Sequence, residues 1–258
     1  MDADSLITTF ALDQGTVISK TKVPKARFLE LPGVLAPKRK LLTDEVASVT
    51  LLSVFNEDTA GIQPTKTTEV LYEEVYFFQV ALKKNTHLAE LNALLQSNIT
   101  NPAIIFYTLD ESVAISAAPK RLSKQEASKT VADHVYLTPW LHITSLTDDE
   151  YLQAGCVTSF SFTPLERLYL DFTNYVRHAE LLSLVPTVTI DSRRDWDTLE
   201  PQLKKYRALT TEHNRLAEEE NKQASFGDKL ASRSKQVKIA SEHNAVLAII
   251  TNLLENKS

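Results

Sequence analysis

Two adjacent lysines at the end of an apolar segment are the residues of this chain that come nearest to a known chemistry. Lys83 and Lys84 follow the segment EVYFFQVAL, which is nearly continuously apolar from Val75 to Leu82. A lysine two residues after a carboxylate on one strand can help to activate water beside a divalent ion that the carboxylate holds. The positions two residues before these lysines are Ala81 and Leu82, so the carboxylate is missing.

The order of elements around these lysines resembles the core of restriction-type nucleases, in which an apolar strand, a helix and a second apolar strand follow one another. In those enzymes the carboxylate and the lysine lie on the first of these strands, and an aspartate lies on the strand before it. Glu73 and Glu74 stand too far from the lysines for this spacing. We therefore predict no catalytic residues, because strand layouts recur without their chemistry, and we keep a nuclease with displaced ligands as the alternative.

Basic residues that could contact a nucleic-acid backbone gather near the start of the chain and at this strand end. The chain has 28 Lys+Arg against 33 Asp+Glu and a formal net charge of −5, so phosphate binding would have to come from a local cluster. Phe28 could add a stacking side chain, and the affinity of such a surface falls steeply as salt rises. The candidate nucleic-acid-binding residues are Lys25, Arg27, Lys38, Arg39, Lys40, Lys83 and Lys84.

The remaining composition argues against several other chemistries. The single cysteine, Cys156, can form neither an intramolecular disulfide nor a cysteine zinc cage, which is typical of a reducing compartment. None of the six histidines has another four residues away, the spacing that helical metal sites favour, and the five glycines are isolated. We predict no metal and no cofactor. The acidic start and the lack of an apolar run of ~20 residues predict a cytoplasmic protein that does not cross a membrane.

The elements that would position these residues are predicted from apolar spacing and from β-branched and aromatic runs. The predicted helices cover residues 37–56, 86–98, with Thr86 as its cap, and 163–186. The predicted strands cover residues 75–82, 103–109, 112–118 and 134–143, and a loop is expected over 56–68. This order predicts an α+β fold over residues 1–190, with a small mixed β-sheet flanked by helices.

Residues 191–258 have a different pattern, because charges are frequent and apolar residues recur only every three or four positions. This is typical of long helices packed along a narrow seam, and we expect a coiled-coil-like hairpin of helices over about 193–223 and 227–256. The hairpin is expected to bind another protein or a second copy of the chain, with Asn244 fixing the register of its seam. The candidate partner-binding residues are Leu203, Tyr206, Phe226, Leu230, Val237, Asn244 and Leu247.

Several segments together resemble one bacterial family. They are V-P-K from Val23 with Phe28 after it, A-P-K-R-K from Ala36, the segments EVYFFQVALKK, HLAELNALLQ and PAIIFYTL, and the Tyr-x-Thr-x-Trp segment from Tyr136 to Trp140. With the charged helical tail, they are similar to the bacterial domain-of-unknown-function family numbered four-three-nine-one. Members of that family tend to be encoded beside helicases and DNA methyltransferases in restriction-like anti-phage loci.

The resemblance implies a role in defence and brings no agreed catalytic residues with it. We therefore expect a non-catalytic accessory subunit of a bacterial restriction-like anti-phage defence system. Its expected partner is a helicase or a DNA methyltransferase, and DNA is a further candidate partner. The alternative from a different class is the metal-dependent restriction-type nuclease with displaced or degenerate ligands.

Overall fold

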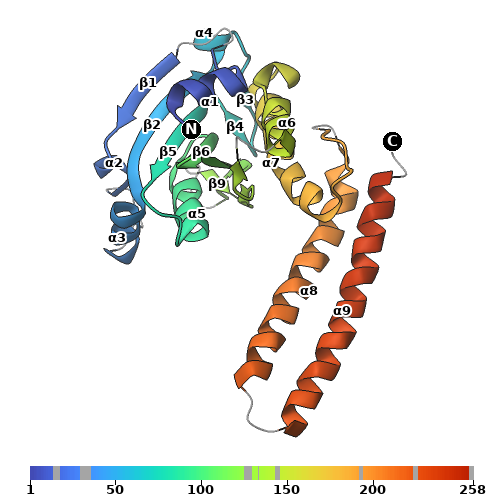
Figure 1. The fold of residues 1–258 in the computed structure, drawn as a ribbon. Helices are drawn as coiled ribbons and strands as arrows, with labels where there is room; N and C mark the ends of the chain where they lie inside the picture. The colour runs from blue at the N-terminus through green and yellow to red at the C-terminus, as the bar shows by residue number, and fades with distance from the viewer. Residues whose placement is uncertain are drawn as a thin grey trace. The chain divides into compact units, whose positions relative to one another are not determined.

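The computed structural model describes residues 1–13, 18–29, 36–124, 130–132, 134–142, 146–191, 194–222 and 226–255 (Figure 1). The chain forms two compact units. The first, here called the body, contains Met1–Glu180 and Ile190–Arg193, and the second, the hairpin unit, contains Leu181–Thr189 and Arg194–Ser258. The predicted boundary after residue 190 concerns independent folding and stays a prediction.

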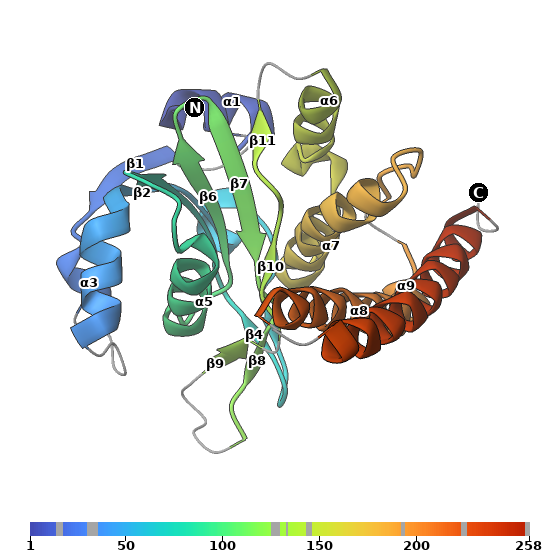
Figure 2. The same ribbon diagram turned by 60° about the horizontal axis from the view of Figure 1, so that its bottom comes forward.

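The body is built on a seven-stranded mixed sheet (Figures 1 and 2). Its strands are β1 (Ile18–Val23), β2 (Val46–Phe55), β5 (Val75–Leu82), β6 (Ala103–Leu109), β7 (Ser112–Ala117), β10 (Tyr136–Leu137) and β11 (Leu141–His142). β2 pairs antiparallel with β1 on one side and with β5 on the other, β6 runs parallel to β5, and β7 runs antiparallel to β6. The parallel pair is joined by the helix α5 (Leu88–Asn98), as a parallel connection requires.

Both faces of the central strands are covered, which explains their almost unbroken apolar sequence. On one face, Phe78, Val80 and Leu82 of β5 belong to a cluster that also holds residues of α3 (Ala36–Glu45) and α5. On the other face, Phe77 packs edge-on against Phe172 of α7 (Leu165–Leu184), with ring centroids 5.8 Å apart. The helix α1 (Ala3–Phe10) lies on this second face, where Phe10 contacts Phe106 of β6.

Shorter elements complete the body. They are α2 (Ala26–Leu29), α4 (Glu57–Ala60), β3 (Thr65–Lys66), β4 (Leu71–Tyr72), β8 (Lys120–Leu122), β9 (Thr130–Ala132), α6 (Leu146–Ala154) and a 3-10 turn over Val157–Ser159. Two small two-stranded sheets pair β3 with β4 and β8 with β9. None of the helices described is both long and apolar enough to span a bilayer.

The strands predicted from residues 75, 103 and 112 onward are confirmed as β5, β6 and β7, and the predicted helix over 86–98 is confirmed as α5. Its N-cap is His87 and not Thr86, and the His87 side chain makes no capping hydrogen bond. The expected strand around Pro139 is split into β10 and β11, which both pair with β7. The expected loop over 56–68 contains α4 and β3.

The prediction of one helix over residues 37–56 is wrong after Glu45, because Val46–Phe55 form the strand β2. Val46 and Val49 join the cluster under α3 and α5, whereas Phe55 packs against Phe77 on the opposite face, with ring centroids 4.9 Å apart. Two irregularities in the pairing with β5 also interrupt the strand. Burial on both faces and these bulges remove the alternation by which a strand is recognised, and they leave an apolar spacing that imitates a helix.

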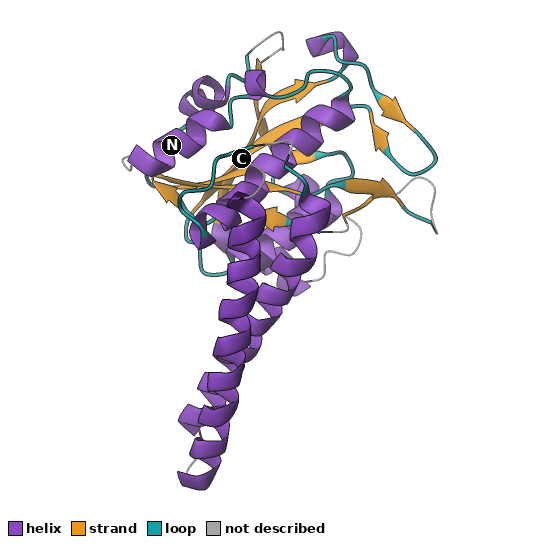
Figure 3. Ribbon diagram, turned by 90° about the vertical axis from the view of Figure 1, so that its right-hand side faces the viewer, coloured by secondary structure: helices purple, strands orange, loops and turns teal. Residues whose placement is uncertain are grey.

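The hairpin unit contains the two predicted long helices, α8 (Trp196–Lys222) and α9 (Phe226–Glu255), which lie side by side (Figure 3). Its apolar core is concentrated near the start of α8 and the end of α9. The buried residues of that core are Leu181, Val185, Trp196, Leu199, Leu203, Val246, Ile250 and Leu254. Beyond this core, Leu216 of α8 is buried and Gln236 of α9 donates a 2.9 Å hydrogen bond to Glu220 of α8.

Candidate functional site

The two lysines of the sequence analysis lie directly after β5, at the end of α3. The backbone N–H of Lys83 donates to the carbonyl of Glu45 (2.7 Å), and its Nζ donates to the carbonyl of Thr43 (2.7 Å). Lys83 therefore caps the C-terminus of α3, where backbone carbonyls lack partners within the helix. The backbone N–H and the Nζ of Lys83 are both used in hydrogen bonds within the body. The Nζ of Lys84 instead lies near a carboxylate.

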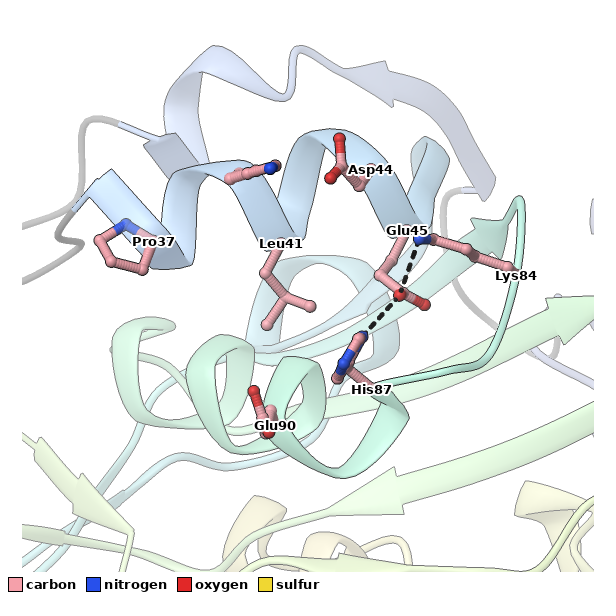
Figure 4. Close-up of a pocket in the computed structure, with 8 residues that line it drawn as sticks. Pro37, Leu41, Asp44, Glu45, Lys84, His87 and Glu90 are labelled. Atoms are coloured by element: carbon pink, nitrogen blue, oxygen red, sulfur yellow. Dashed lines mark hydrogen bonds and ion pairs between the residues drawn. The ribbon is translucent and has the colours of Figure 1, made fainter.

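That carboxylate is Glu45, the last residue of α3. The strand β2 begins immediately after it and pairs antiparallel with β5, with Val46 opposite Leu82. Glu45 is thereby brought beside the residues that follow β5, although they are far apart in sequence. Its Oε1 lies 3.0 Å from Nδ1 of His87 and 3.6 Å from Nζ of Lys84 (Figure 4).

The environment of Glu45 favours its charged form. The side chain is 1% exposed, and burial alone would raise its pKa. The hydrogen bond from His87 and the charge of Lys84 outweigh burial, so the pKa of this carboxyl lies below its ordinary value. Its second oxygen, Oε2, is buried and has no hydrogen-bond partner among the described residues. The carboxylate therefore contributes mainly by holding the connection between β5 and α5 against the end of α3.

A cavity of about 310 Å³ opens beside this cluster. It is lined by Pro37, Lys40, Leu41, Asp44, Glu45, Lys84, His87 and Glu90. Acidic and basic side chains alternate around it, so no single sign of charge dominates. No group of three histidine, cysteine or acidic residues in the described part of the chain is placed to hold a metal ion. The cluster thus has the carboxylate and the lysine of metal-dependent hydrolysis but lacks a complete ligand set.

A restriction-type nuclease would carry its carboxylate at one of two positions near the end of β5, and in this chain both positions hold packed apolar side chains. Leu82 is buried in the cluster under α3 and α5, and Ala81 is partly buried on the other face of the sheet. The polar residue nearest to them on β5, Gln79, donates its side-chain amide to the carbonyl of Met1 (3.1 Å) and to the hydroxyl of Thr108 (3.2 Å). The strand therefore offers no acidic side chain for a metal ion.

The candidate nucleic-acid-binding residues fall into two groups. Lys25, Lys83 and Lys84 are engaged within the body, Lys25 through a 2.9 Å hydrogen bond from Nζ to the carbonyl of Val46. The exposed group lies on α2 and on the first turns of α3, which pack on the same apolar cluster through Phe28 and Leu42. Its members are Arg27, Lys38, Arg39 and Lys40.

Phe28 is not available for stacking on a base. Its ring is buried and packs edge-on against Phe78, with centroids 6.4 Å apart. The exposed basic group of α2 and α3 therefore presents charge without an aromatic platform.

The candidate partner-binding residues of the hairpin also separate into two groups. Leu203 is fully buried in the hairpin core, and Tyr206 packs on the ring of His243 at 4.0 Å between centroids. In contrast, Leu230 and Val237 on α9 are 60% and 68% exposed. An external partner could reach these two apolar side chains.

The remaining three partner-binding candidates lie differently. Asn244 is exposed and Leu247 is partly buried, while the side chain of Phe226 lies outside the described residues. The prediction that Asn244 is the register residue of the hairpin seam is wrong, because His243 occupies the seam. The ring of His243 contacts Tyr206, and its Nε2 lies 3.0 Å from the hydroxyl of Thr210.

Sequence reasoning missed Glu45, although a signal was present. Had residues 46–55 been recognised as a strand paired with residues 75–82, the acidic pair before it, Asp44 and Glu45, would have been placed beside Lys83 and Lys84. The error in one element therefore concealed the carboxylate that lies beside Lys84.

The chain has no significant match among curated proteins or among solved structures. A comparison with family models does find a match, which covers residues 11–239. These residues include the whole described sheet, the Glu45 cluster, all of α8 and the exposed residues Leu230 and Val237 of α9. Because the match extends over most of its length, the chain belongs to the family described as Domain of unknown function (DUF4391).

Proposed function

We propose that the chain is a non-catalytic accessory subunit of a bacterial restriction-like anti-phage defence system that acts in the cytoplasm. In this proposal the body contacts a helicase or DNA methyltransferase subunit, and the hairpin unit is an assembly arm. The observation that carries the proposal is the exposure of Leu230 and Val237 on a helix whose residues Val246, Ile250 and Leu254 are buried in the hairpin core. Large apolar side chains on one exposed helix face mark interaction surfaces.

The chemistry of the body supports a role without catalysis. The strand positions that would hold a metal are apolar, and Gln79 is already paired within the fold. The exposed basic residues on the first turns of α3 could contact phosphates beside a partner, with an affinity that moderate salt would nearly abolish. DNA is accordingly proposed as a secondary contact and not as a substrate.

The test of the proposal is co-purification. The tagged full chain is expressed with a helicase and a methyltransferase encoded beside its gene, and we expect one of them to be retained in a stoichiometric complex. A variant with Lys38, Arg39 and Lys40 each changed to Glu should keep this complex but lose binding to labelled duplex DNA at low salt. Failure of both subunits to bind the intact chain would refute the proposal.

The nuclease remains a second candidate because Glu45 lies 3.6 Å from Lys84. If this pair were a displaced catalytic pair, the purified chain would cleave DNA with Mg²⁺ or Mn²⁺. Cleavage should then disappear in both Glu45→Gln and Lys84→Ala, whereas Asp44→Asn serves as a neighbouring acidic control. We expect no cleavage from the unaltered chain under these conditions.

A further inference from the structure

The cavity between α3 and α5 contains carboxylates that the chain itself does not satisfy. Its charged lining residues are three acids and two lysines, namely Asp44, Glu45, Glu90, Lys40 and Lys84 (Figure 4). Lys84 and His87 both approach Oε1 of Glu45, whereas the buried Oε2 has no hydrogen-bond partner among the described residues. The carboxylates of Asp44 and Glu90 are exposed and take part in no ion pair within the described part of the chain. The cavity therefore offers more acceptors than its own lysines use.

These carboxylates are arranged for a broad cation and not for a point charge. They come from the end of α3 and the first turn of α5, and no group of three acidic, histidine or cysteine side chains in the described ranges is placed to hold a metal ion. A cation whose N–H groups are spread over a plane can reach carboxylates that do not meet at one point. The guanidinium group is such a cation, because its donors form a rigid fork that fits carboxylate oxygens.

A long side chain from outside can enter this cavity. Lys84 and His87, which approach Glu45, are 50% and 48% exposed, so either can turn aside without disturbing the core. A second cavity of about 290 Å³ continues between the same two helices and shares Leu41 and Glu90 with the first. Leu41 is only partly buried, so it offers an apolar wall to the methylene groups of such a side chain.

We infer that the cavity between α3 and α5 receives the guanidinium group of an arginine side chain that an associated protein supplies. This inference rests on the proposed function, because it names the chemical group by which the partner engages the body. The guanidinium donates to Oε2 of Glu45 and to the carboxylates of Asp44 and Glu90, and its alkyl stem lies against Leu41. In the chain alone Lys84 pairs with Glu45, so this lysine competes with the incoming arginine. Arginines inserted in this way are among the residues that dominate binding at protein interfaces.

The first experiment titrates the full chain with N-acetylargininamide, which has the arginine side chain but no terminal charges. Binding is followed by NMR through the methyl groups of Leu41. We expect saturable binding with a Kd on the order of 1 mM, because one side chain makes few contacts. N-acetylcitrullinamide is the matched control, since it has nearly the same shape and no charge, and it should leave these signals unchanged. N-acetyllysinamide should bind more weakly, because its ammonium cannot reach all the acceptors at once.

Charges on the cavity wall should change this affinity in opposite directions, which a general loss of structure would not do. Asp44→Asn combined with Glu90→Gln should weaken the binding of N-acetylargininamide roughly fivefold, because two exposed acceptors lose their charge. Lys84→Met should strengthen it roughly twofold, because the competing cation is removed. Glu111→Gln is the control, since Glu111 is an exposed acid on the turn between β6 and β7, and it should leave the affinity unchanged.

The second experiment uses the co-purified complex of the full chain. The double variant Asp44→Asn, Glu90→Gln should lose most of the helicase or methyltransferase subunit, and an excess of N-acetylargininamide should displace that subunit from the unaltered chain. Two results would overturn the inference: an arginine analogue that binds no better than the citrulline analogue, or a double variant that keeps its partner at full yield. Either result leaves the accessory role standing. If the arginine analogue binds but no subunit co-purifies with the intact chain, the accessory role fails, and the cavity takes a free guanidine instead of a side chain of a partner.

Discussion

At the residue scale, Glu45 shows what a sequence can and cannot reveal about a candidate site. The two lysines were found because they end an apolar run, and the absence of a carboxylate two residues earlier is visible in the sequence. The carboxylate that does approach Lys84 comes from another strand, and strand pairing is set by the packing of the whole sheet. Its contacts with Lys84 and His87 could therefore not be predicted from spacing.

Glu45→Gln should destabilise the chain by about 1–3 kcal/mol at pH 7, because a buried charged hydrogen bond is lost. The pKa of Glu45 is lowered in the folded chain, so its stabilisation is present above its ordinary value of 4.5 and is lost as the pH falls through the folded pKa. Urea unfolding should therefore show a difference between the two chains that shrinks at low pH. The exposed neighbour Asp44, changed to Asn, should have little effect, and an equal loss there would contradict the role of Glu45.

A second buried charge lies at the other end of α5. Lys120 is 3% exposed, and its Nζ donates to the carbonyls of Gln96 and Ile99, which end that helix. Burial disfavours the ammonium and lowers the pKa of Lys120 to about 8. The helix C-terminus is a favourable place for a cation, so the contact compensates part of the cost of burial.

The contribution of Lys120 to the stability of the chain should rise with pH between about 8 and 9.5, by about 2 kcal/mol, because unfolded Lys120 keeps its proton up to its ordinary pKa whereas folded Lys120 releases it near 8. Above about pH 10 the trend should reverse, since burial raises the pKa of Tyr72 to about 12 and unfolded tyrosines ionise first. Chemical unfolding of Lys120→Met across this range checks the assignment. A rise of equal size in that variant would show that another group causes it.

At the element scale, an element whose apolar residues form one long run or one continuous face could be predicted from the sequence. An element whose burial depends on contacts with several neighbouring elements could not. β5, β6 and α7 have long apolar runs or a continuous apolar face, so their type is visible in the sequence. β2 is buried on both faces and bulged, and its spacing imitates a helix. The short N-terminal elements α1 and β1 were missed because their apolar residues are few and gain their burial from the sheet that they cover.

Two neighbouring residues of α9, His243 in the seam of the hairpin and Asn244 outside it, allow a prediction with a matched control. His243→Ala should loosen the middle of the hairpin, with about 1 kcal/mol less protection of the amides of α8 and α9, because it loses the Tyr206 ring contact and the Thr210 hydrogen bond. Asn244→Ala should not, since Asn244 is exposed and alanine favours a helix. Hydrogen exchange on the full chain at low concentration measures both, and equal effects would mean that His243 does not hold the register.

At the scale of the whole molecule, the sequence shows where charged residues become more frequent. It does not show where one apolar core ends and the next begins. The predicted boundary after residue 190 follows the rise in charge, whereas the division of the structure follows apolar contact. Leu181 and Val185 belong to the apolar core of the hairpin unit, together with Trp196 and Leu199. The helix α7 begins in the body and ends in the hairpin unit. Its amino-acid composition does not change at the residue where its buried side chains leave one apolar core and join the other.

A chain that ends at Thr189 should still unfold in a single cooperative transition, because the described cluster on the α3 and α5 face of the sheet contains no residue of α8 or α9, and ring contacts on the other face join the sheet to α1 and α7. It should lose association with a partner or with a second copy of the chain, since α8 and α9 are removed. The truncation exposes Leu181 and Val185, whose partners are Trp196, Leu199 and their neighbours, so the plain truncated chain should be less soluble. Changing both residues to Lys should restore solubility without changing the transition, as urea unfolding followed by circular dichroism would show. If the chain with both lysines still fails to fold, the hairpin unit is part of what stabilises the body, and the body is not an independent domain.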